Sequence, residues 1–487
     1  MPRTLVEIDR ESGEPLYRQV RNAVEHGIAV GFYPPEQPLP SSRELAKELG
    51  VSRNTINLAY QELIAEGYVE SQQRSGLFVN REMRAHTVRQ RSSLPSAPGV
   101  DWTSRIRSYP DAGLPHLDKR PDWHRYRYPF PAGQVDVAAF PVRAWSRCLS
   151  EALTYPHRYA SLQDSVGSDD PMLVDMVCKH LLPARGIAAT PEEVLVTVGS
   201  QQGLDLLART LLRPGQLVGV EDPGYLDARH IFLRAGARVH GYPVDSAGLR
   251  PPDSLRGVDL LYLTPSHQHP TNATLHIGRR RELVRLAAEA GTILVEDDYD
   301  SEFRYQGSPT PALKALDTAG DVVYAGTFSK FLSPGLRLGY LAGPAELIRE
   351  LRTVRRYEHR HPAGQLQRAL ALLISSGEYR RALRRYRNRL LRKWTLACSA
   401  AREHLPWTPG PLPPGGVSLW LMGPPELSAQ RLIELADERD VLIERGDICY
   451  LGDPPQGSPI RIGFAATPFA AIEPGVRIIG ELARELL

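Results

Sequence analysis

The chain has 487 residues, which at about 100–200 residues per domain is enough for two to four domains. Its 59 lysines and arginines nearly balance its 56 aspartates and glutamates, which excludes a wholly basic, histone-like coat for nucleic acid. Hydrophobic residues make up 42% of the chain and charged residues 24%, so the chain can bury large cores and intrinsic disorder is excluded as its main state.

The start of the chain and its cysteines favour a cytoplasmic protein. The first residues, MPRTLVEIDR, contain no apolar run of the kind that a secretory signal needs. No stretch approaches the roughly 18 apolar residues of a transmembrane helix. The cysteines are far apart and have neither the paired spacing of a zinc site nor the density of a disulfide scaffold. We therefore expect cytoplasmic localisation, no membrane partner and no metal site, with buried, reduced thiols.

Composition divides the chain into a head, a linker and a body. We expect the head at residues 1–80, a basic linker at 81–125 and the body at 126–487. The head has eight basic and eleven acidic residues, a net charge of −3, whereas residues 81–130 have ten and five, a net charge of +5. The basic part is therefore the linker and not the head.

The head has the pattern of a helix-turn-helix followed by a wing. A first amphipathic helix opens at Pro15, and the S-x-x-E capping box of Ser41 and Glu44 opens a short second helix. Gly50 then makes the turn, and Ser52 caps a third helix. This third helix is expected over 53–66 and the wing strands over 67–70 and 77–79. The expected core positions are Leu16, Val20, Val24, Ile28, Leu45, Ala46, Leu49, Ile56, Ala59, Tyr60 and Leu63.

Exposed side chains at the start of the third helix favour DNA binding over the alternative, a small helical dimerisation module with the same caps. Arg53, Asn54 and Thr55 stand where a recognition helix enters the major groove. Because the head is acidic overall, binding requires a local basic patch and two-fold symmetry rather than bulk charge. The candidate DNA-binding residues are Arg43, Ser52, Arg53, Asn54, Thr55, Arg74 and Gly76.

Residues 10–80 resemble the winged helix of GntR-type bacterial regulators in three stretches: PLYRQVRNAVEHG, LPSSRELAKELGVSRNTINLAYQELIAEGYVE and RSGLFV. The resemblance implies double-stranded operator DNA as a partner. Arg74-Ser75-Gly76-Leu77 stands where the family more often has Gly-Ser-Gly-Thr. This departure concerns only the contact at the tip of the wing.

From about residue 126 on, short β-branched runs alternate with amphipathic helical patterns. The alternation predicts an α/β fold with a mainly parallel sheet covered by helices, in which ligands bind at the carboxyl ends of the strands. We expect a larger subdomain at about 160–345, an Arg-rich helical region at 345–405 and a smaller α+β subdomain mainly at 375–487. The expected strands are 194–198, 217–220, 260–263, 292–296 and 322–325, and the expected helices include 201–212 and 279–290.

A lysine and a carboxylate stand just past two of the expected strands. Lys330 follows the run 322–325, where a lysine amine is desolvated, has a lowered pKa and can form a Schiff base with an aldehyde. Asp297 ends a neighbouring strand, 33 residues before Lys330. A carboxylate there is what the nitrogen of a pyridinium ring requires. The pair therefore favours a cofactor that is a pyridine aldehyde.

Other residues near these strand ends suit the phosphate and the ring of such a cofactor. Arg337 can bind a phosphate through two N–H groups, and 199–202 lie between a strand and a helix, where backbone N–H groups attract one. Tyr225 is placed to stack on the ring, and Tyr299 to donate to its phenolate oxygen. Each feature alone has an ordinary explanation, such as a helix cap or a surface ion pair. Five such features in this order favour a cofactor-binding site over these separate explanations.

The body resembles the fold-type I PLP-dependent aminotransferases in GTFSKFLSPGLRLGY, VEDDYDSEFRY, TPSHQHPT and VEDPGY. These motifs resemble those of one group in particular, the MocR-type subfamily of GntR regulators, in which a linker joins a winged helix to an aminotransferase-like body. The resemblance implies pyridoxal 5'-phosphate (PLP) as cofactor, with Lys330 as the Schiff-base lysine, Asp297 on the pyridine nitrogen, Tyr225 stacking and Tyr299 near the 3-hydroxyl. It also implies that Ser200, Gln201, Thr327 and Arg337 hold the phosphate, and that Arg461 binds the carboxylate of a substrate or effector.

The pocket departs from the aminotransferase pattern while the cofactor residues are kept. His269 stands where aminotransferases have an asparagine, Asn272 replaces a glycine, and Ser418 replaces a histidine common in the family. Residues 164–174 lack the familiar glycine-rich turn. These departures affect the identity of the effector and not the binding of PLP. Arg461 is a lone arginine in an apolar run, which also calls for an anionic partner.

Three functions compete for this combination of parts. The first is a transcriptional regulator whose body senses PLP, alone or with an amino compound that displaces Lys330 and forms an external aldimine. The second is an active aminotransferase with an autoregulatory DNA-binding head, and the third is an inactive body that serves only for dimerisation. The DNA-binding head disfavours the second, and the complete set of Lys330, Asp297 and Arg337 disfavours the third. We expect the first.

Two-fold recognition of an operator requires a dimer, and the resemblance implies a head-to-tail, domain-swapped homodimer. Two basic segments leave alternatives open. The arginines in 81–91 either touch DNA phosphates or belong to an ordinary solvated linker. The arginines in 380–393 either face DNA or form ion pairs on a helix surface.

Overall fold

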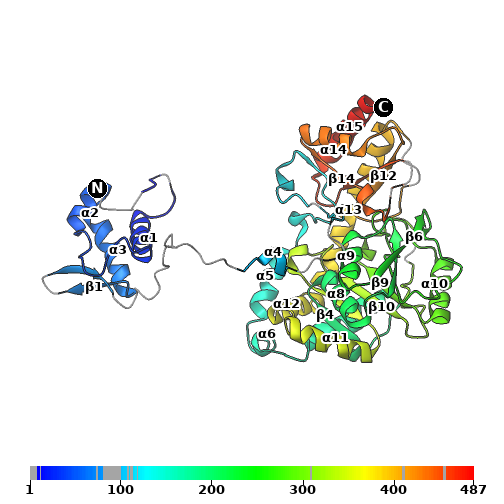
Figure 1. Cartoon of the computed structure of the whole chain (residues 1–487), viewed down its shortest axis with the longest axis horizontal. Helices are drawn as coiled ribbons and strands as arrows, with labels where there is room; N and C mark the ends of the chain where they lie inside the picture. The colour runs from blue at the N-terminus through cyan, green and yellow to red at the C-terminus, as the bar shows by residue number, and fades with distance from the viewer. Residues whose placement is uncertain are drawn as a thin grey trace. The chain divides into compact units, whose positions relative to one another are not determined.

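The computed structural model describes residues 8–10, 12–72, 75–80, 100–106, 109, 113–117, 119–307, 310–407, 412–452, 454 and 457–487. The chain forms two compact units, Met1–Arg107 and Ser108–Leu487 (Figure 1). The first contains the predicted head and the second the predicted body. No helix in the described ranges combines the length and the hydropathy that a membrane span requires.

The head is a helix-turn-helix with an antiparallel wing, as the sequence predicts. Its elements are α1 (Leu16–Ala29), α2 (Ser42–Leu49), α3 (Arg53–Ala65), β1 (Val69–Gln72) and β2 (Gly76–Val79). The apolar faces of the helices pack together, and the expected core positions are buried except Leu16 and Leu49, which are half-buried.

Capping and turn residues explain where α2 begins and ends and where α3 begins. The Ser41 hydroxyl accepts a hydrogen bond from the Glu44 N–H (3.3 Å), and the Glu44 carboxylate accepts one from the Ser41 N–H (3.0 Å), which completes the predicted capping box. Gly50 ends α2 in the left-handed region at φ 62°, which favours glycine. The Ser52 hydroxyl accepts the Thr55 N–H (3.1 Å) at the start of α3. Local chemistry therefore sets the turn between the two helices.

The body is built around a mainly parallel sheet, as predicted. Its strands are β4 (Val194–Thr197), β5 (Leu217–Asp222), β6 (Arg238–Asp245), β7 (Gly248–Leu249), β8 (Leu260–Leu263), β9 (Ile293–Asp298), β10 (Val322–Thr327) and β11 (Gly339–Ala342). Their order is β4-β11-β10-β9-β8-β5-β6-β7. Strand β11 is antiparallel to both neighbours and β7 to β6, whereas the other pairs are parallel.

Helices bury both faces of this sheet. On β4, Leu195 packs into the apolar cluster under α8, α9 and α11, whereas Val194 and Val196 pack into the cluster under α5, α7 and α12. Successive residues of a strand point to opposite faces, so an uninterrupted apolar run indicates burial on both. The helices are α5 (Val142–Glu151), α7 (Pro171–Met176), α8 (Gly199–Leu211), α9 (Leu226–Arg234), α10 (Ile277–Ala290), α11 (Ala345–Glu358) and α12 (Gly364–Ser375).

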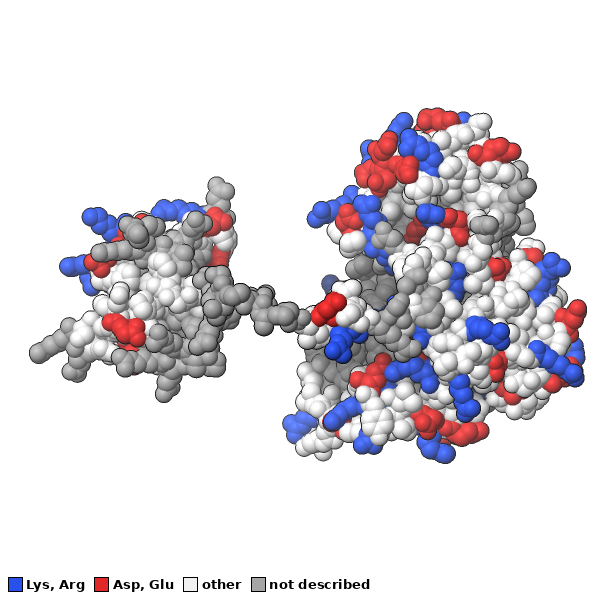
Figure 2. Space-filling view, viewed as in Figure 1, with Lys and Arg blue, Asp and Glu red and all other residues white. Residues whose placement is uncertain are grey.

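Helix α13 (Glu378–His404) carries the arginine run whose role the sequence left open. Arg389 pairs with Asp136 at 2.6 Å, and the guanidinium of Arg392 lies 4.9 Å from the centre of the Phe469 ring. These two arginines thus contact the body itself. Basic and acidic side chains are interspersed on the visible face of the body rather than gathered by sign (Figure 2).

The smaller C-terminal layer includes the beginning of the body. Strand β3 (Tyr128–Pro129) lies parallel to β13 (Val441–Leu442), and the Phe130 N–H donates to the Leu442 carbonyl oxygen at 3.0 Å. Phe130 is fully buried in the core of this layer. The sequence analysis did not anticipate this pairing. The other elements of the layer are β12 (Ser418–Gly423), α14 (Ala429–Glu438), β14 (Glu444–Arg445), β15 (Ser458–Gly463) and α15 (Phe469–Leu486).

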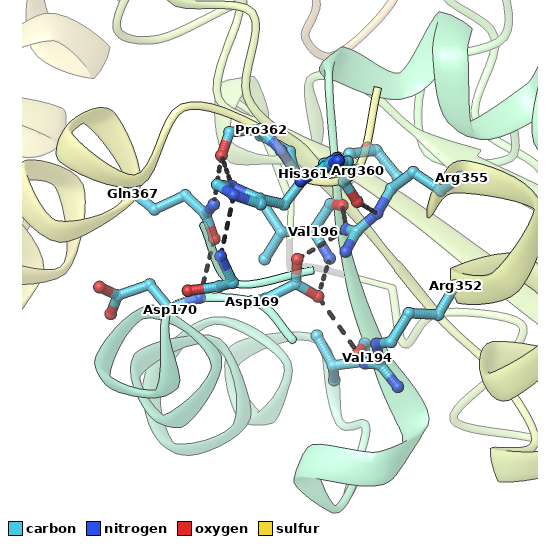
Figure 3. Close-up of polar contacts among 12 residues, drawn as sticks. Asp169, Asp170, Val194, Val196, Arg352, Arg355, Arg360, His361, Pro362 and Gln367 are labelled. Atoms are coloured by element: carbon cyan, nitrogen blue, oxygen red, sulfur yellow. Dashed lines mark hydrogen bonds and ion pairs between the residues drawn. The ribbon is translucent and has the colours of Figure 1, made fainter. Parts of the chain in front are cut away.

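A buried ion pair joins α11 to the edge strand β4 (Figure 3). Nη1 of Arg355 lies 2.6 Å from Oδ1 of Asp169, and both side chains are fully buried. The Val196 N–H donates to Oδ2 of Asp169 at 3.1 Å, and Arg355 also donates to the Val196 carbonyl oxygen. Arg352, one helical turn away, reaches the same carboxylate at 3.7 Å. Backbone and side chain together therefore satisfy this buried carboxylate.

Candidate functional site

A cavity of about 150 Å³ lies at the carboxyl ends of the parallel strands. Residues at or just after the ends of β4, β5, β8, β9 and β10 line it, together with β15 of the smaller layer. This is the edge of the sheet at which the sequence analysis expects a ligand. All the cofactor and effector residues expected from the sequence lie on its wall: Ser200, Gln201, Tyr225, Asp297, Tyr299, Thr327, Lys330, Arg337 and Arg461.

Lys330 follows β10, and its Nζ is 5.7 Å from the centre of the Tyr299 ring. Burial lowers the pKa of the Lys330 amine to about 8, and the positive charges of Lys119 and Arg461 add to this effect. A Cβ added to Gly133 would lie 3.2 Å from Nζ, so the glycine leaves space for the amine. More of this amine is uncharged and nucleophilic at neutral pH than that of an ordinary lysine.

We expect the rate at which PLP-free protein reacts with added PLP to rise with pH and to level off above about pH 8, because only the uncharged Lys330 amine attacks an aldehyde. Stopped-flow absorbance of the visible band measures this rate across the neutral and alkaline range. A rate that keeps rising through the ordinary lysine pKa of about 10.4 would contradict the lowered pKa.

Strand β9 separates its acidic residues onto two faces. Asp297 lines the cavity, whereas the next carboxylate, Asp298, points away and pairs with Arg185 at 2.7 Å. The Tyr262 hydroxyl donates to Oδ2 of Asp297 at 2.9 Å. Burial raises the pKa of Asp297 to about 7, and the hydrogen bond from Tyr262 opposes this shift. A cation placed beside Asp297 would stabilise the carboxylate.

Two buried polar atoms of the wall, Oδ1 of Asp297 and the hydroxyl of Tyr299, have no hydrogen-bond partner among the described residues. Leaving such a group unpaired costs about 1–3 kcal/mol. A pyridinium nitrogen would pair with the carboxylate, and a phenolate oxygen on the same ring would accept from the hydroxyl. The wall therefore fits the ring of PLP.

The start of α8 has the features of a phosphate site. The helix begins directly after β4, so the N–H groups of Gly199, Ser200 and Gln201 have no partners within the helix. Gly199 has a φ of 76°, and a Cβ there would lie 2.9 Å from Nη2 of Arg337. Arg337 donates to the Val198 carbonyl oxygen at 3.2 Å and forms no ion pair with a described residue. The guanidinium of Arg337 therefore lies beside the N-terminus of α8, and both groups attract a phosphate.

Arg461 on β15 is 7% exposed and is held by neutral side chains. Its Nη1 lies 2.9 Å from Nε2 of His269, and its Nε donates to the Ser418 hydroxyl at 3.2 Å. Burial and the charge of Arg461 lower the pKa of His269 well below its ordinary value, so the uncharged ring accepts this hydrogen bond. Asn272 donates to the Ser418 carbonyl oxygen at 2.6 Å. The three departures from the aminotransferase pattern therefore gather around this arginine.

No acidic side chain in the described part of the chain forms an ion pair with Arg461. A buried guanidinium without an acidic partner is costly unless an anion reaches it. The arrangement thus favours a ligand that brings an acid group to this end of the cavity.

Sequence reasoning missed other residues of the cavity wall. Tyr262 and Thr264 stand at the end of β8, where the strand-end rule would have found them. Lys119, Gly133 and Glu444 come from outside the parallel strands, the lysine from the expected linker. No local motif marks these three residues, because only the tertiary fold brings them to the cavity.

In the head, the predicted residues Ser52, Arg53, Asn54 and Thr55 lie at the start of α3, whereas Arg43 lies on α2 and Gly76 on β2. The Ser52 and Thr55 hydroxyls lie 2.8 Å apart and shape this helix start. Arg74 lies outside the described residues. The exposed members of the predicted set are Arg43, Ser52, Arg53, Asn54 and Gly76.

Two protein families match the chain. Residues 16–79 match the bacterial regulatory proteins of the gntR family, and residues 158–479 match aminotransferase class I and II. The chain is 39% identical to the HTH-type transcriptional regulator TauR of Rhodobacter capsulatus over 96% of each chain. It is 34% identical to the probable rhizopine catabolism regulatory protein MocR of Rhizobium meliloti over 82% of this chain and 79% of that one.

Among solved structures, the fold is similar to a kynurenine aminotransferase of Pyrococcus horikoshii in complex with PMP, KYN and KYA. The TM-score is 0.71 at 26% identity, with 79% of this chain and 98% of that one covered.

Proposed function

The chain belongs to the MocR-type HTH transcriptional regulators, which join a gntR-family winged helix to an aminotransferase-like body, and from this premise we propose that it is a PLP-dependent sensor. It binds operator DNA as a homodimer and responds to PLP, alone or with a small amino compound, in the cytoplasm. PLP supplies an aldehyde that condenses with amines. Lys330 holds this aldehyde, Asp297 the ring nitrogen and Arg337 the phosphate.

One observation carries the proposal: side chains that the sequence analysis selected from separate motifs line a single cavity, and two of them, Asp297 and Tyr299, are buried with unpaired polar atoms. A body used only for dimerisation gains nothing from such atoms, which destabilise the fold. The remaining predicted roles are phosphate binding by Ser200, Gln201 and Thr327, ring stacking by Tyr225, and binding of an effector's acid group by Arg461.

Sensing is favoured over turnover by the surroundings of Arg461. His269 and Ser418 bind the arginine directly. His269 replaces an asparagine typical of aminotransferases, and Ser418 replaces a histidine common in the MocR-type family. These changes alter the surroundings of the effector's acid group, while Lys330, Asp297 and Arg337 are kept. The relatives reported above are likewise named as regulators.

The test is the visible spectrum of the purified protein with PLP while amines are titrated in. A band that shifts with one amine and stays shifted supports a sensor. Continuous release of keto acid would contradict sensing and support an active aminotransferase. A protein without a visible band would overturn the role of Lys330.

A homodimer is supported by the need of a two-fold operator for two copies of the head. The body also exposes large apolar side chains, with Tyr155 77% and Tyr357 82% accessible. We propose the head-to-tail, domain-swapped arrangement for this dimer. Val137, Val142, Leu153, Tyr159 and Leu162 are exposed as well.

Replacing Arg53 by alanine is expected to weaken binding to the operator by about 1–3 kcal/mol, because the side chain lies exposed at the start of α3, where a recognition helix meets base edges. Fluorescence anisotropy with operator DNA at fixed salt measures the affinity. Gln61→Ala, an exposed position further along the same helix, is the control and should leave the affinity unchanged. Equal affinities for Arg53→Ala and Gln61→Ala would contradict the assignment of α3.

A further inference from the structure

The chain just before β3 is held against both layers of the body. The His116 ring stacks on His230 of α9, with ring centres 4.6 Å apart, and the Pro115 carbonyl oxygen lies 2.9 Å from Nε2 of His230. A few residues later, Arg120 pairs with Asp437 of α14 at 3.8 Å. We call residues 113–117 and 119–122 the strap. Between these anchors, Leu117 and Lys119 line the cofactor cavity.

Lys119 of the strap lines the cofactor cavity. A Cβ added to Gly133 would lie 3.6 Å from Nζ of Lys119 and 3.2 Å from Nζ of Lys330, so the two amines share one side of the cavity. The positive charge of Lys119 also contributes to the low pKa of Lys330 and of His269. No hydrogen bond or ion pair joins this amine to another residue that the structure describes. Its charge is therefore available to a ligand.

Lys119 and Arg461 act on the same carboxylate without pairing with it. Both lie near Glu444, whose Oε1 accepts the Ala132 N–H at 2.8 Å. Neither cation forms an ion pair within 4.0 Å with this carboxylate or with another described one. Asp227, the other carboxylate of the wall not assigned to the cofactor, accepts a hydrogen bond from the Tyr225 hydroxyl at 3.1 Å. Both cations are therefore left to pair with an acid group on a ligand.

We propose that Lys119 is part of the effector site, where it binds, together with Arg461, the acid group of a small amino acid whose amine reaches the Lys330 end of the cavity. This inference rests on the proposed function and adds to it a binding residue outside the aminotransferase motifs. The strap precedes the body in the sequence and continues back toward the head. An acid group between Lys119 and Arg461 therefore connects the strap to β15.

The test compares Lys119→Gln with Arg125→Gln in the full-length, PLP-loaded protein. Arg125 follows the strap, is exposed and does not line the cofactor cavity, so this control removes the same charge from a nearby position without removing an anchor of the strap. The probes are glycine, β-alanine and γ-aminobutanoate, each paired with the amine of equal chain length that lacks the acid group: methylamine, ethylamine and propylamine. The visible spectrum reports binding, and anisotropy with operator DNA reports the response.

We expect Lys119→Gln to weaken binding of the acid-bearing probes about tenfold or more relative to their paired plain amines, the usual loss for a charged hydrogen bond. A change shared by both kinds of probe reflects the Lys330 pKa, which Lys119 helps to lower. Arg125→Gln should bind all probes as wild type does. Lys119→Gln should also lose the change in DNA affinity that the acid-bearing probes cause in the wild-type protein.

Equal losses for acid-bearing and plain amines would overturn the inference, because they would reflect altered reactivity of Lys330. Wild-type affinity of Lys119→Gln for every probe would overturn it too, as would a wild-type protein that does not prefer any acid-bearing probe over its paired amine. These outcomes leave the proposed function intact. A wild-type protein without the visible band would overturn both this inference and the proposed function.

Discussion

Replacing Lys330 by alanine is expected to abolish the visible absorption band of the PLP-loaded protein, because no other described lysine amine combines a position past β10 with a pKa lowered to about 8. PLP then stays only through its contacts with Asp297, Arg337 and the start of α8, and gel filtration should remove it. Absorbance of the protein fraction before and after the column measures both effects. The change in operator affinity that amines cause should vanish.

A matched control is Lys179→Ala, because Lys179 is exposed and pairs only with Asp175 on the same helical face. It should keep the band and the response. A band that survives Lys330→Ala would assign the covalent role to a different amine, and Lys119→Gln would then identify it. Loss of the band with an unchanged response to amines would show that the change in DNA affinity does not depend on PLP.

Replacing Arg355 by alanine is expected to lower the free energy of unfolding of the body by about 3–5 kcal/mol, because Asp169 would remain buried without its cation. The two side chains are fully buried and 2.6 Å apart. Urea unfolding followed by tryptophan fluorescence reports mainly on this transition, since five of the six tryptophans lie in Ser108–Leu487 and none lies in residues 1–80. The transition should move to lower urea concentration.

Arg352→Ala is the control for this prediction. Arg352 reaches the same Asp169 carboxylate from the same helix, but at 3.7 Å and with 23% of its side chain exposed, so its loss should cost far less. The double variant Asp169→Asn, Arg355→Met removes both charges and should recover most of the stability. Equal losses for Arg355→Ala and Arg352→Ala would show that the buried pair contributes no more than a surface pair.

The sequence predicts those parts of the cavity that depend on strand ends. Asp297 on β9 and Tyr299 just past its end are two residues apart, and the alternation of the strand predicts that both point to the same side. Lys330 is found in the same way from the end of β10. The helix caps of the head are equally local, which is why the boundaries of α2 and α3 agree with the predicted turn.

Contacts between distant segments could not be predicted in this way. Lys119 reaches the cavity because the strap is anchored at His230 and Asp437, and no periodicity of the strap itself records those partners. Glu444 lies on β14, which is too short for its alternation to indicate a face. Strand β11 was missed because Gly339–Ala342 is a brief apolar run between a phosphate-site loop and a helix.

The pairing of β3 with β13 also determines when the body can be completed during synthesis. Ala132 and Glu444, which bond across this part of the smaller layer, are separated by 312 residues. At about 5–20 residues per second, Phe130 leaves the ribosome roughly 15–60 seconds before its partner strand exists. The head, whose described core and strand contacts lie within residues 8–80, can fold during that interval. Each new molecule thus has a folded DNA-binding unit before its sensing unit can form.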